Sequence, residues 1–197
     1  DGELEGFTLL FYGLGRGEAA DVALQNRLAP IEKAIHEGHE TIRSSVQNGQ
    51  KLLDQRDFDG VSKEVSTLHT VTAQLPKEVW QEPDSRGCVT RLRNRAIMGA
   101  SVLNYNKVMV ELTDNPNQSS QDLQCKRQPV AQLEWDAASQ GDKGLQTVAR
   151  KRGFQLDVQI KATKALEQVQ EGDFSNANHG QVGLDHFIQE QTQGGST

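Results

Sequence analysis

Aliphatic residues recur at intervals of three and four along most of this chain, and this period constrains the fold more than any other feature. The charged residues and glutamines fill the gaps between them, so each apolar stripe marks one face of an amphipathic helix. The longest stripe comprises Leu28, Ile31, Ile35, Ile42, Val46, Leu52, Leu53, Phe58, Val61, Val65, Leu68 and Leu75. The pattern predicts a mostly helical chain.

Prolines and polar segments mark the expected helix boundaries. Pro30 is expected to open the first helix, because proline is tolerated in a first turn where its missing N–H costs nothing. Pro76 is expected to end the stripe, since proline cannot continue a helix interior without strain. A further amphipathic run covers 89–112, and the polar segment 113–122 is expected to be a loop. Pro129 is expected to start the next helix. The last apolar stripe before Gly172 is expected to face the core and comprises Leu145, Val148, Leu156, Ile160, Leu166 and Val169.

The pair Asp-Phe occurs twice between amphipathic runs, at 57–58 and at 173–174. Aspartate is a preferred N-cap residue, so each copy is expected to start a new helix, and the phenylalanine that follows is expected to pack at the start of that helix. Gly172 precedes the second copy and is expected to stop a helix, which makes a tight antiparallel hairpin there. No glycine precedes the first copy, so Asp57 is compatible either with a new helix or with a kink in one long helix.

These boundaries together predict an all-α fold. At 197 residues the chain has the length of one domain. We expect an up-down four-helix bundle with additional loop or helical segments over 21–191. An extended glycine-rich arm over 1–20 is expected before it, and a disordered tail over 192–197 after it.

The charge balance limits the classes of partner. Acidic residues number 27 against 21 basic ones, which gives a net charge of −6. A basic surface is the electrostatic requirement for non-specific nucleic-acid binding, so no nucleic-acid partner is expected. The apolar run at 7–12 is far shorter than the roughly 18–20 residues that a membrane-spanning helix needs. It also lacks the basic flank of an intact signal peptide, and we expect a mature, soluble product.

The two cysteines, Cys88 and Cys125, leave two interpretations open. A single pair suits one disulfide in an oxidising compartment, but spacing in sequence cannot show that the two Cα atoms approach closely. Two unpaired thiols are equally compatible. Neither cysteine has a second cysteine or a histidine at ligand spacing, so a zinc site is not expected.

No motif predicts catalysis, a cofactor or a strong metal site. In "HEGHE" the histidines His36 and His39 are three residues apart, whereas a zinc helix places them four apart on one face. A solvated helix face is the simpler interpretation, and a weak divalent site with Glu40 is the alternative. The glycines of 12–17 resemble a phosphate-binding loop, but Glu18 stands where the dinucleotide fingerprint needs its third glycine. A flexible hinge is expected there instead.

The segment "RLRNR" at 91–95 is the one compact basic cluster in the sequence. Its three arginines, Arg91, Arg93 and Arg95, are compatible with a solvated helix face. The functional alternative is a docking patch for an acidic protein surface, because a guanidinium pairs with a carboxylate through two parallel hydrogen bonds.

Two segments carry a resemblance to a known family. "LLDQRDFDGVSKEVSTL" at 52–68 resembles the first-to-second helix junction of PsbQ-type subunits, the extrinsic lumenal proteins of photosystem II. A competing register matches that junction to Trp80 and the Leu-Arg pair at 92–93, with one long first helix over 30–75. The segment 161–190 is similar to the last helical hairpin of the family. The sequence departs from the family in its glycine-rich arm, where plant members are proline-rich, and in additional residues around 113–153.

The resemblance implies a non-catalytic four-helix subunit without a cofactor. It would dock on the lumenal face of photosystem II, peripheral to the thylakoid membrane, beside the core and the other extrinsic subunits. There it would help to retain calcium and chloride at the oxygen-evolving manganese cluster. Docking would involve the arm 1–20, with Arg16, and the arginines of 91–95. The alternative is a secreted or periplasmic helical bundle that senses a ligand or binds another protein.

Overall fold

The computed structural model describes residues 18–81 and 85–172, together with the single residues 183, 185 and 188. The regular structure in these residues is helical and includes no strand, so the all-α prediction is confirmed. The helices are α2 (Glu18–Asp54), α3 (Phe58–Thr70), α4 (Lys77–Gln81), α5 (Arg86–Asp114), α6 (Ser120–Ser139) and α7 (Lys143–Gln170). Residues 1–17 of the predicted arm and the whole predicted tail lie outside the described residues, whereas 18–20 belong to α2.

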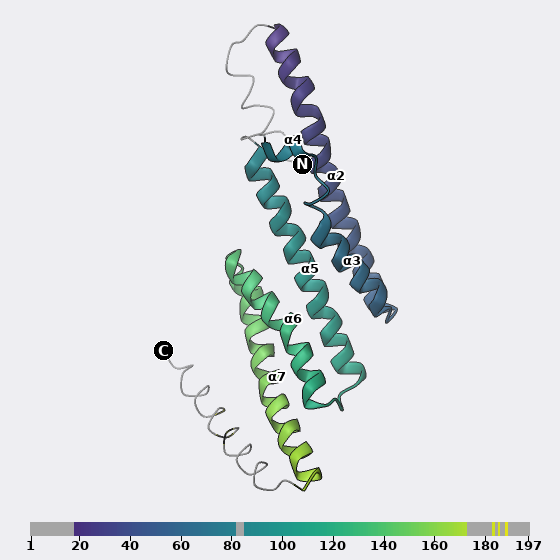
Figure 1. The fold of residues 1–197 in the computed structure, drawn as a ribbon, viewed down its shortest axis with the longest axis vertical. Coiled ribbons are helices and arrows are strands. Elements are labelled where there is room, and N and C mark those ends of the chain that lie inside the picture. Colours follow the sequence, from purple (N-terminus) through teal and green to yellow (C-terminus); the bar gives the residue numbers. More distant parts are fainter. Residues whose placement is uncertain (1–17, 82–84, 173–182, 184, 186–187, 189–197) are drawn as a thin grey trace.

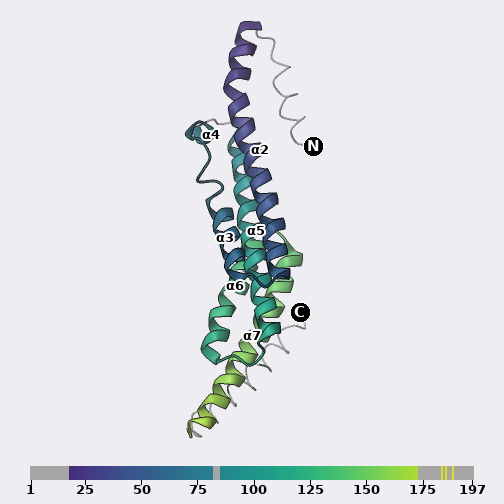
Figure 2. The same ribbon diagram turned by 90° about the vertical axis from the view of Figure 1, so that its right-hand side faces the viewer.

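The chain runs up and down along one long axis (Figure 1). The helix α3 returns antiparallel to α2, and the short α4 leads into α5, which therefore runs parallel to α2. The helices α6 and α7 then form a second hairpin against the lower part of α5. In the orthogonal view, α2 extends toward one end of the elongated molecule and α7 toward the other (Figure 2).

Two clusters of buried apolar side chains hold the helices together, and α5 contributes to both. The first cluster lies between α2, α3, α4 and the part of α5 up to Leu103, and includes Ile31, Leu53, Leu68 and Leu92. The second comprises Val108, Leu112, Leu123, Val130, Leu156 and Ile160. The described helices thus form two groups that share α5. The first comprises α2, α3, α4 and α5, and the second comprises α5, α6 and α7. The single four-helix core stays a prediction.

The parallel pair α2 and α5 approaches closely because glycines of α2 face leucines of α5. A Cβ atom placed on Gly38 would lie 2.8 Å from Leu92 Cδ2, and one on Gly49 would lie 2.7 Å from Leu103 Cδ1. The two glycines are eleven residues apart, and so are the two leucines. Eleven residues make three turns at about 3.67 residues per turn, so both contacts lie on the same line between the two helices. Gly38 therefore serves packing between the two helices.

The first Asp-Phe pair marks a full chain reversal. The helix α2 ends at Asp54, Arg56 adopts a left-handed φ of 62°, and the Asp57 carboxylate accepts a hydrogen bond from the Gly60 N–H at 2.9 Å. The Arg56 side chain reaches the end of α5, where its Nε lies 2.7 Å from Asp114 Oδ2. The N-cap prediction for Asp57 is confirmed. The kink and the single helix over 30–75 are wrong, because the chain turns back at this site.

Both prolines that were expected to start helices lie inside them. Pro30 lies within α2 and Pro129 within α6. Each helix extends upstream because residues before the proline still contact the core: Leu28 is buried in the first cluster and Leu123 in the second. Burial of these side chains offsets the hydrogen bond that each proline removes. The predicted loop over 113–122 shortens to 115–119, since Ser119 caps α6 by accepting from the Asp122 N–H.

The end of α7 differs from the expected pattern of buried stripes. Leu166 is 63% exposed, although the sequence placed it on a core-facing stripe. The buried face of α7 is formed instead by Ala149, Gly153, Leu156 and Ile160, and Leu166 lies on a different side of the helix. Gly172 has a φ of 81°, which confirms the predicted helix stop. The predicted cap and hairpin at 173–174 lie outside the described residues.

Candidate functional site

The first half of α5 carries the basic segment, and a buried serine occupies the N-cap position of this helix. Ser85 is 1% exposed and precedes the first residue of α5. Its hydroxyl donates to the main-chain oxygen of Val79 in α4, which joins the two helices. A short helix bearing Trp80 is thereby held beside the first turns of α5.

The structure distributes the predicted docking arginines over two sides of α5. At about 100° per residue, Arg91 and Arg95 lie on one side and Arg93 lies roughly opposite, together with Arg86 seven residues earlier. Arg95 Nη1 lies 3.3 Å from His39 Nδ1 of α2, and Arg91 Nη2 lies 3.5 Å from Cys88 Sγ. All four arginines are exposed. Arg16, the remaining predicted docking residue, lies outside the described residues.

Arg93 lies on the wall of a groove between α4, α5 and α6. The groove has a volume of about 270 Å³. It is lined by Trp80 from α4, by Val89, Thr90, Arg93, Asn94 and Ile97 from α5, and by Trp135, Asp136, Ser139 and Gln140 from the end of α6. The chain contains two tryptophans, and both line this groove although they are far apart in sequence. We call it the tryptophan groove.

The tryptophans of this groove are unusually open to solvent. Trp80 is 45% exposed and Trp135 is 67% exposed. Most of the surface of a tryptophan is apolar, so the groove presents an aromatic surface that the described residues leave uncovered. Below it, Asp136 is only 2% exposed. Its carboxylate accepts from the Ser101 hydroxyl and from Gln132 Nε2, which lies 3.1 Å from both oxygens.

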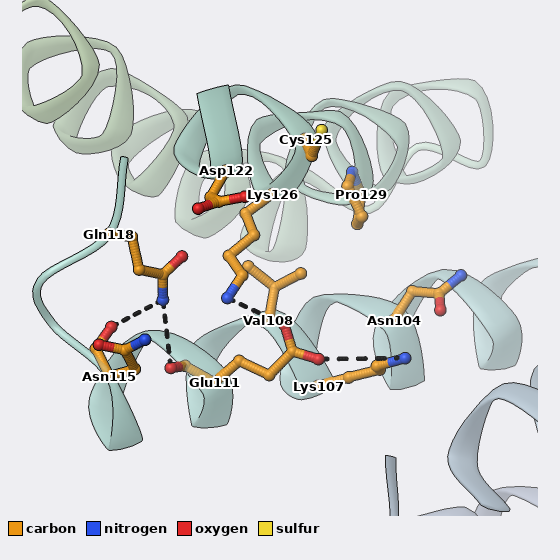
Figure 3. A pocket seen from close by; sticks show the side chains of 10 residues that line it. All are labelled: Asn104, Lys107, Val108, Glu111, Asn115, Gln118, Asp122, Cys125, Lys126 and Pro129. Atoms are coloured by element: carbon orange, nitrogen blue, oxygen red, sulfur yellow. Dashed lines mark hydrogen bonds and ion pairs between the residues drawn. The ribbon is translucent and has the colours of Figure 1, made fainter. Parts of the chain in front are cut away.

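A second hollow, of about 390 Å³, lies at the other end of α5 and is polar (Figure 3). Glu111 lies between two lysines, with its carboxylate 3.1 Å from Lys126 Nζ and 4.0 Å from Lys107 Nζ. Lys107 also donates to the Ser62 hydroxyl at 2.8 Å. Gln118 Nε2 donates to the main-chain oxygen of Asn115 at 2.7 Å. The charges of this hollow thus compensate one another, whereas the buried Gln118 Oε1 has no hydrogen-bond partner among the described residues.

The two cysteines are free thiols and lie far apart. Cys88 is in the first turn of α5, whereas Cys125 lies in the polar hollow beside Lys107 and Val108, near the other end of that helix. From Cys88 to Lys107 the helix α5 spans on the order of 30 Å, at about 1.5 Å per residue. A disulfide requires Cα atoms within about 7 Å, so the interpretation with two unpaired thiols is the one that the structure supports.

The histidine segment does not assemble a metal site. His36 and Glu40 are exposed on α2, while His39 is the partner of Arg95. No cluster of three or more potential metal ligands exists among the described residues. The solvated-face interpretation of "HEGHE" agrees with this placement.

Comparisons with protein-family models, with curated proteins and with solved structures found no match for this chain. Within the described residues, no helix combines the length and apolar character that a membrane span requires.

The sequence identified Arg93 but not the groove in which it lies. Trp135 interrupts a polar stretch of α6, and a large aromatic on an otherwise solvated face was a signal that could have been used. Trp80 appeared only as a marker of a helix junction. The two tryptophans line one groove because α5 and α6 pack side by side, and no local sequence pattern predicts this packing.

Proposed function

We propose that this chain is a non-catalytic docking subunit that binds an acidic protein surface through the start of α5. The observation that carries the proposal is the density of arginine there. Arg86, Arg91, Arg93 and Arg95 lie within ten residues and are all exposed, in a chain whose net charge is −6. Local positive charge on a negative chain steers and orients an acidic partner.

Three arginines elsewhere among the described residues pair with carboxylates within the fold. Arg56 pairs with Asp114, Arg127 with Asp157 at 3.0 Å, and Arg150 with Glu134 at 2.8 Å. By contrast, no acidic side chain among the described residues lies within ion-pairing distance of Arg93. Its guanidinium therefore retains its capacity for bidentate pairing with a carboxylate of another protein.

The resemblance to PsbQ-type subunits supplies the partner in this proposal. The acidic surface would belong to the lumenal face of photosystem II, and the protein would lie in the thylakoid lumen, peripheral to the membrane. Bound there, it would help to retain calcium and chloride at the manganese cluster without contributing a ligand. The arm at 1–17 would add to the contact.

The test is rebinding to thylakoid membranes from which salt has removed the extrinsic proteins. Wild-type protein is expected to rebind at low salt and to be released as the salt concentration rises, because salt screens exposed ion pairs. Reversal of Arg91, Arg93 and Arg95 to glutamate is expected to abolish rebinding.

The matched control is Lys143→Glu, Lys151→Glu and Lys164→Glu, which changes the net charge equally at three exposed positions of α7. This control is expected to rebind much more strongly than the arginine variant. Equal rebinding of the two variants would refute docking through α5. Failure of wild-type protein to rebind would refute the photosystem as the partner and favour the secreted or periplasmic binding domain.

A further inference from the structure

We infer that the tryptophan groove is a socket for one apolar side chain of an acidic partner segment. The inference rests on the proposed function in one respect, namely that the partner surface is acidic. It goes further by naming the residues that select the partner and the chemistry that they select. An apolar anchor would enter between Trp80 and Trp135, and a neighbouring carboxylate would pair with Arg93.

The aromatic surface gives the first argument. Tryptophan and arginine are the residues most enriched where binding energy concentrates in protein interfaces. Both tryptophans of the chain and one exposed arginine line a single groove, and helices α4, α5 and α6 are all needed to bring them together. Exposed fractions of 45% and 67% leave much aromatic surface for a partner to cover.

The charge of the groove gives the second argument. Among the residues that line it, Arg93 and Asp136 are the charged ones. Asp136 is 2% exposed, and its oxygens already accept from Ser101 and Gln132. The charge that a partner meets is therefore that of Arg93, supplemented by Arg86 on the same side of α5. This arrangement favours an acidic segment over a basic one.

The size of the groove gives the third argument. Pockets for drug-sized ligands typically measure about 300–1,000 Å³, and this groove lies below that range at about 270 Å³. It is also bounded by Asn94 and Gln140, whose side-chain amides can hydrogen-bond to the backbone of a bound segment. The hydroxyls of Thr90 and Ser139 on the same wall already donate to main-chain oxygens of their own helices. One side chain of an extended or helical partner segment suits this volume.

Intrinsic fluorescence is a selective probe of the socket, because both tryptophans of the chain line it. The probe ligand is a short synthetic peptide of glutamates with one central leucine. Its controls are the same peptide with serine in place of leucine, and with glutamine in place of the glutamates. Titration into the full chain is expected to shift the emission to shorter wavelength and to saturate with the leucine peptide. Both control peptides are expected to bind at least about tenfold more weakly.

Variants identify the residues responsible. Trp135→Ala and Arg93→Gln are each expected to weaken binding of the leucine peptide about tenfold or more, whereas Arg43→Gln, an exposed arginine on α2, is expected to have no effect. Circular dichroism of each variant establishes that it is folded. Equal affinity for the leucine and serine peptides, or no change in emission, would overturn the socket.

Rebinding to salt-washed thylakoid membranes separates the two proposals. If the wild type rebinds and the Trp80→Ala, Trp135→Ala double variant rebinds equally well, the socket is wrong and the docking function stands. If the wild type does not rebind but discriminates between the peptides, the socket stands and the photosystem is not its partner.

Discussion

Substitution of Gly49 by alanine tests the close approach of α2 and α5. The added Cβ would lie 2.7 Å from Leu103 Cδ1 and 2.9 Å from Cδ2, closer than real Cβ atoms come. Alanine improves helix propensity by about 1 kcal/mol, whereas overpacking a core costs about 1–3 kcal/mol. Because Leu103 is 1% exposed and tightly enclosed, the packing cost should dominate. We expect a net loss of about 1 kcal/mol in the free energy of unfolding.

The assay is urea unfolding followed by far-ultraviolet circular dichroism. Gly87→Ala is the matched control, because a Cβ atom on this exposed glycine of α5 meets nothing within 4 Å. It should leave stability unchanged or raise it by up to about 1 kcal/mol. In a Leu103→Ala background the packing cost of about 2 kcal/mol should disappear and the helix-propensity gain should remain, so the coupling between the two sites should be about 2 kcal/mol. Equal stabilisation by the Gly49 and Gly87 substitutions would refute the glycine-mediated contact.

Three further predictions concern single sites. Asp57→Ala removes the cap of α3 and should lower the free energy of unfolding by about 1 kcal/mol in the same urea assay, and no loss would contradict the cap. Hydrogen bonds from the hydroxyl and then from the main-chain N–H of Ser120 hold the pKa of Glu167 below the ordinary value of a glutamate. The stabilising effect of this contact is therefore present above that ordinary pKa and is lost as pH falls through the lower pKa of the folded state. Glu167→Gln should therefore reduce the acid dependence of the thermal midpoint, and an unchanged pH profile would argue against this contact. Leu166→Ala should change stability by less than about 0.5 kcal/mol, whereas Leu156→Ala should cost about 2–5 kcal/mol, and similar costs would contradict their different burial.

Local patterns in the sequence predicted most helices but not all of their ends. The stripe that includes Val61, Val65 and Leu68 is buried as expected, because amphipathic period and burial have the same cause. Pro30 and Pro129 were misinterpreted because a proline rule considers one residue, whereas the helix extends wherever upstream side chains such as Leu123 still gain burial.

Contacts between helices were harder to predict. The equal eleven-residue spacing of the pairs Gly38–Gly49 and Leu92–Leu103 is visible in the sequence and could have indicated a parallel seam. Nothing local indicates that Arg56 can hold a left-handed turn, since its stabilising partner Asp114 is 58 residues away. Contacts between helices determine the structure at such sites, and a pattern within one helix does not reveal them.

The sequence predicted the basic residues of the candidate site but not the groove that Arg93 lines. The arginines of 91–95 were expected to act as one patch, yet helix geometry turns Arg93 away from Arg91 and Arg95. The tryptophan groove depends on where α6 ends beside α5, and this follows from the length of the 115–119 connection and the packing of the second core. A linear motif predicts neither where α6 ends beside α5 nor how the second core packs.

Hydrogen exchange of the full chain, free and bound to salt-washed thylakoid membranes, tests most directly whether the start of α5 and the tryptophan groove form the docking surface. We predict that binding slows exchange in the segments 77–97 and 132–142. The polar hollow around Glu111 and the exposed side of α7 should exchange at unchanged rates. Protection confined to α7 or to the polar hollow, with none at 77–97, would contradict the account.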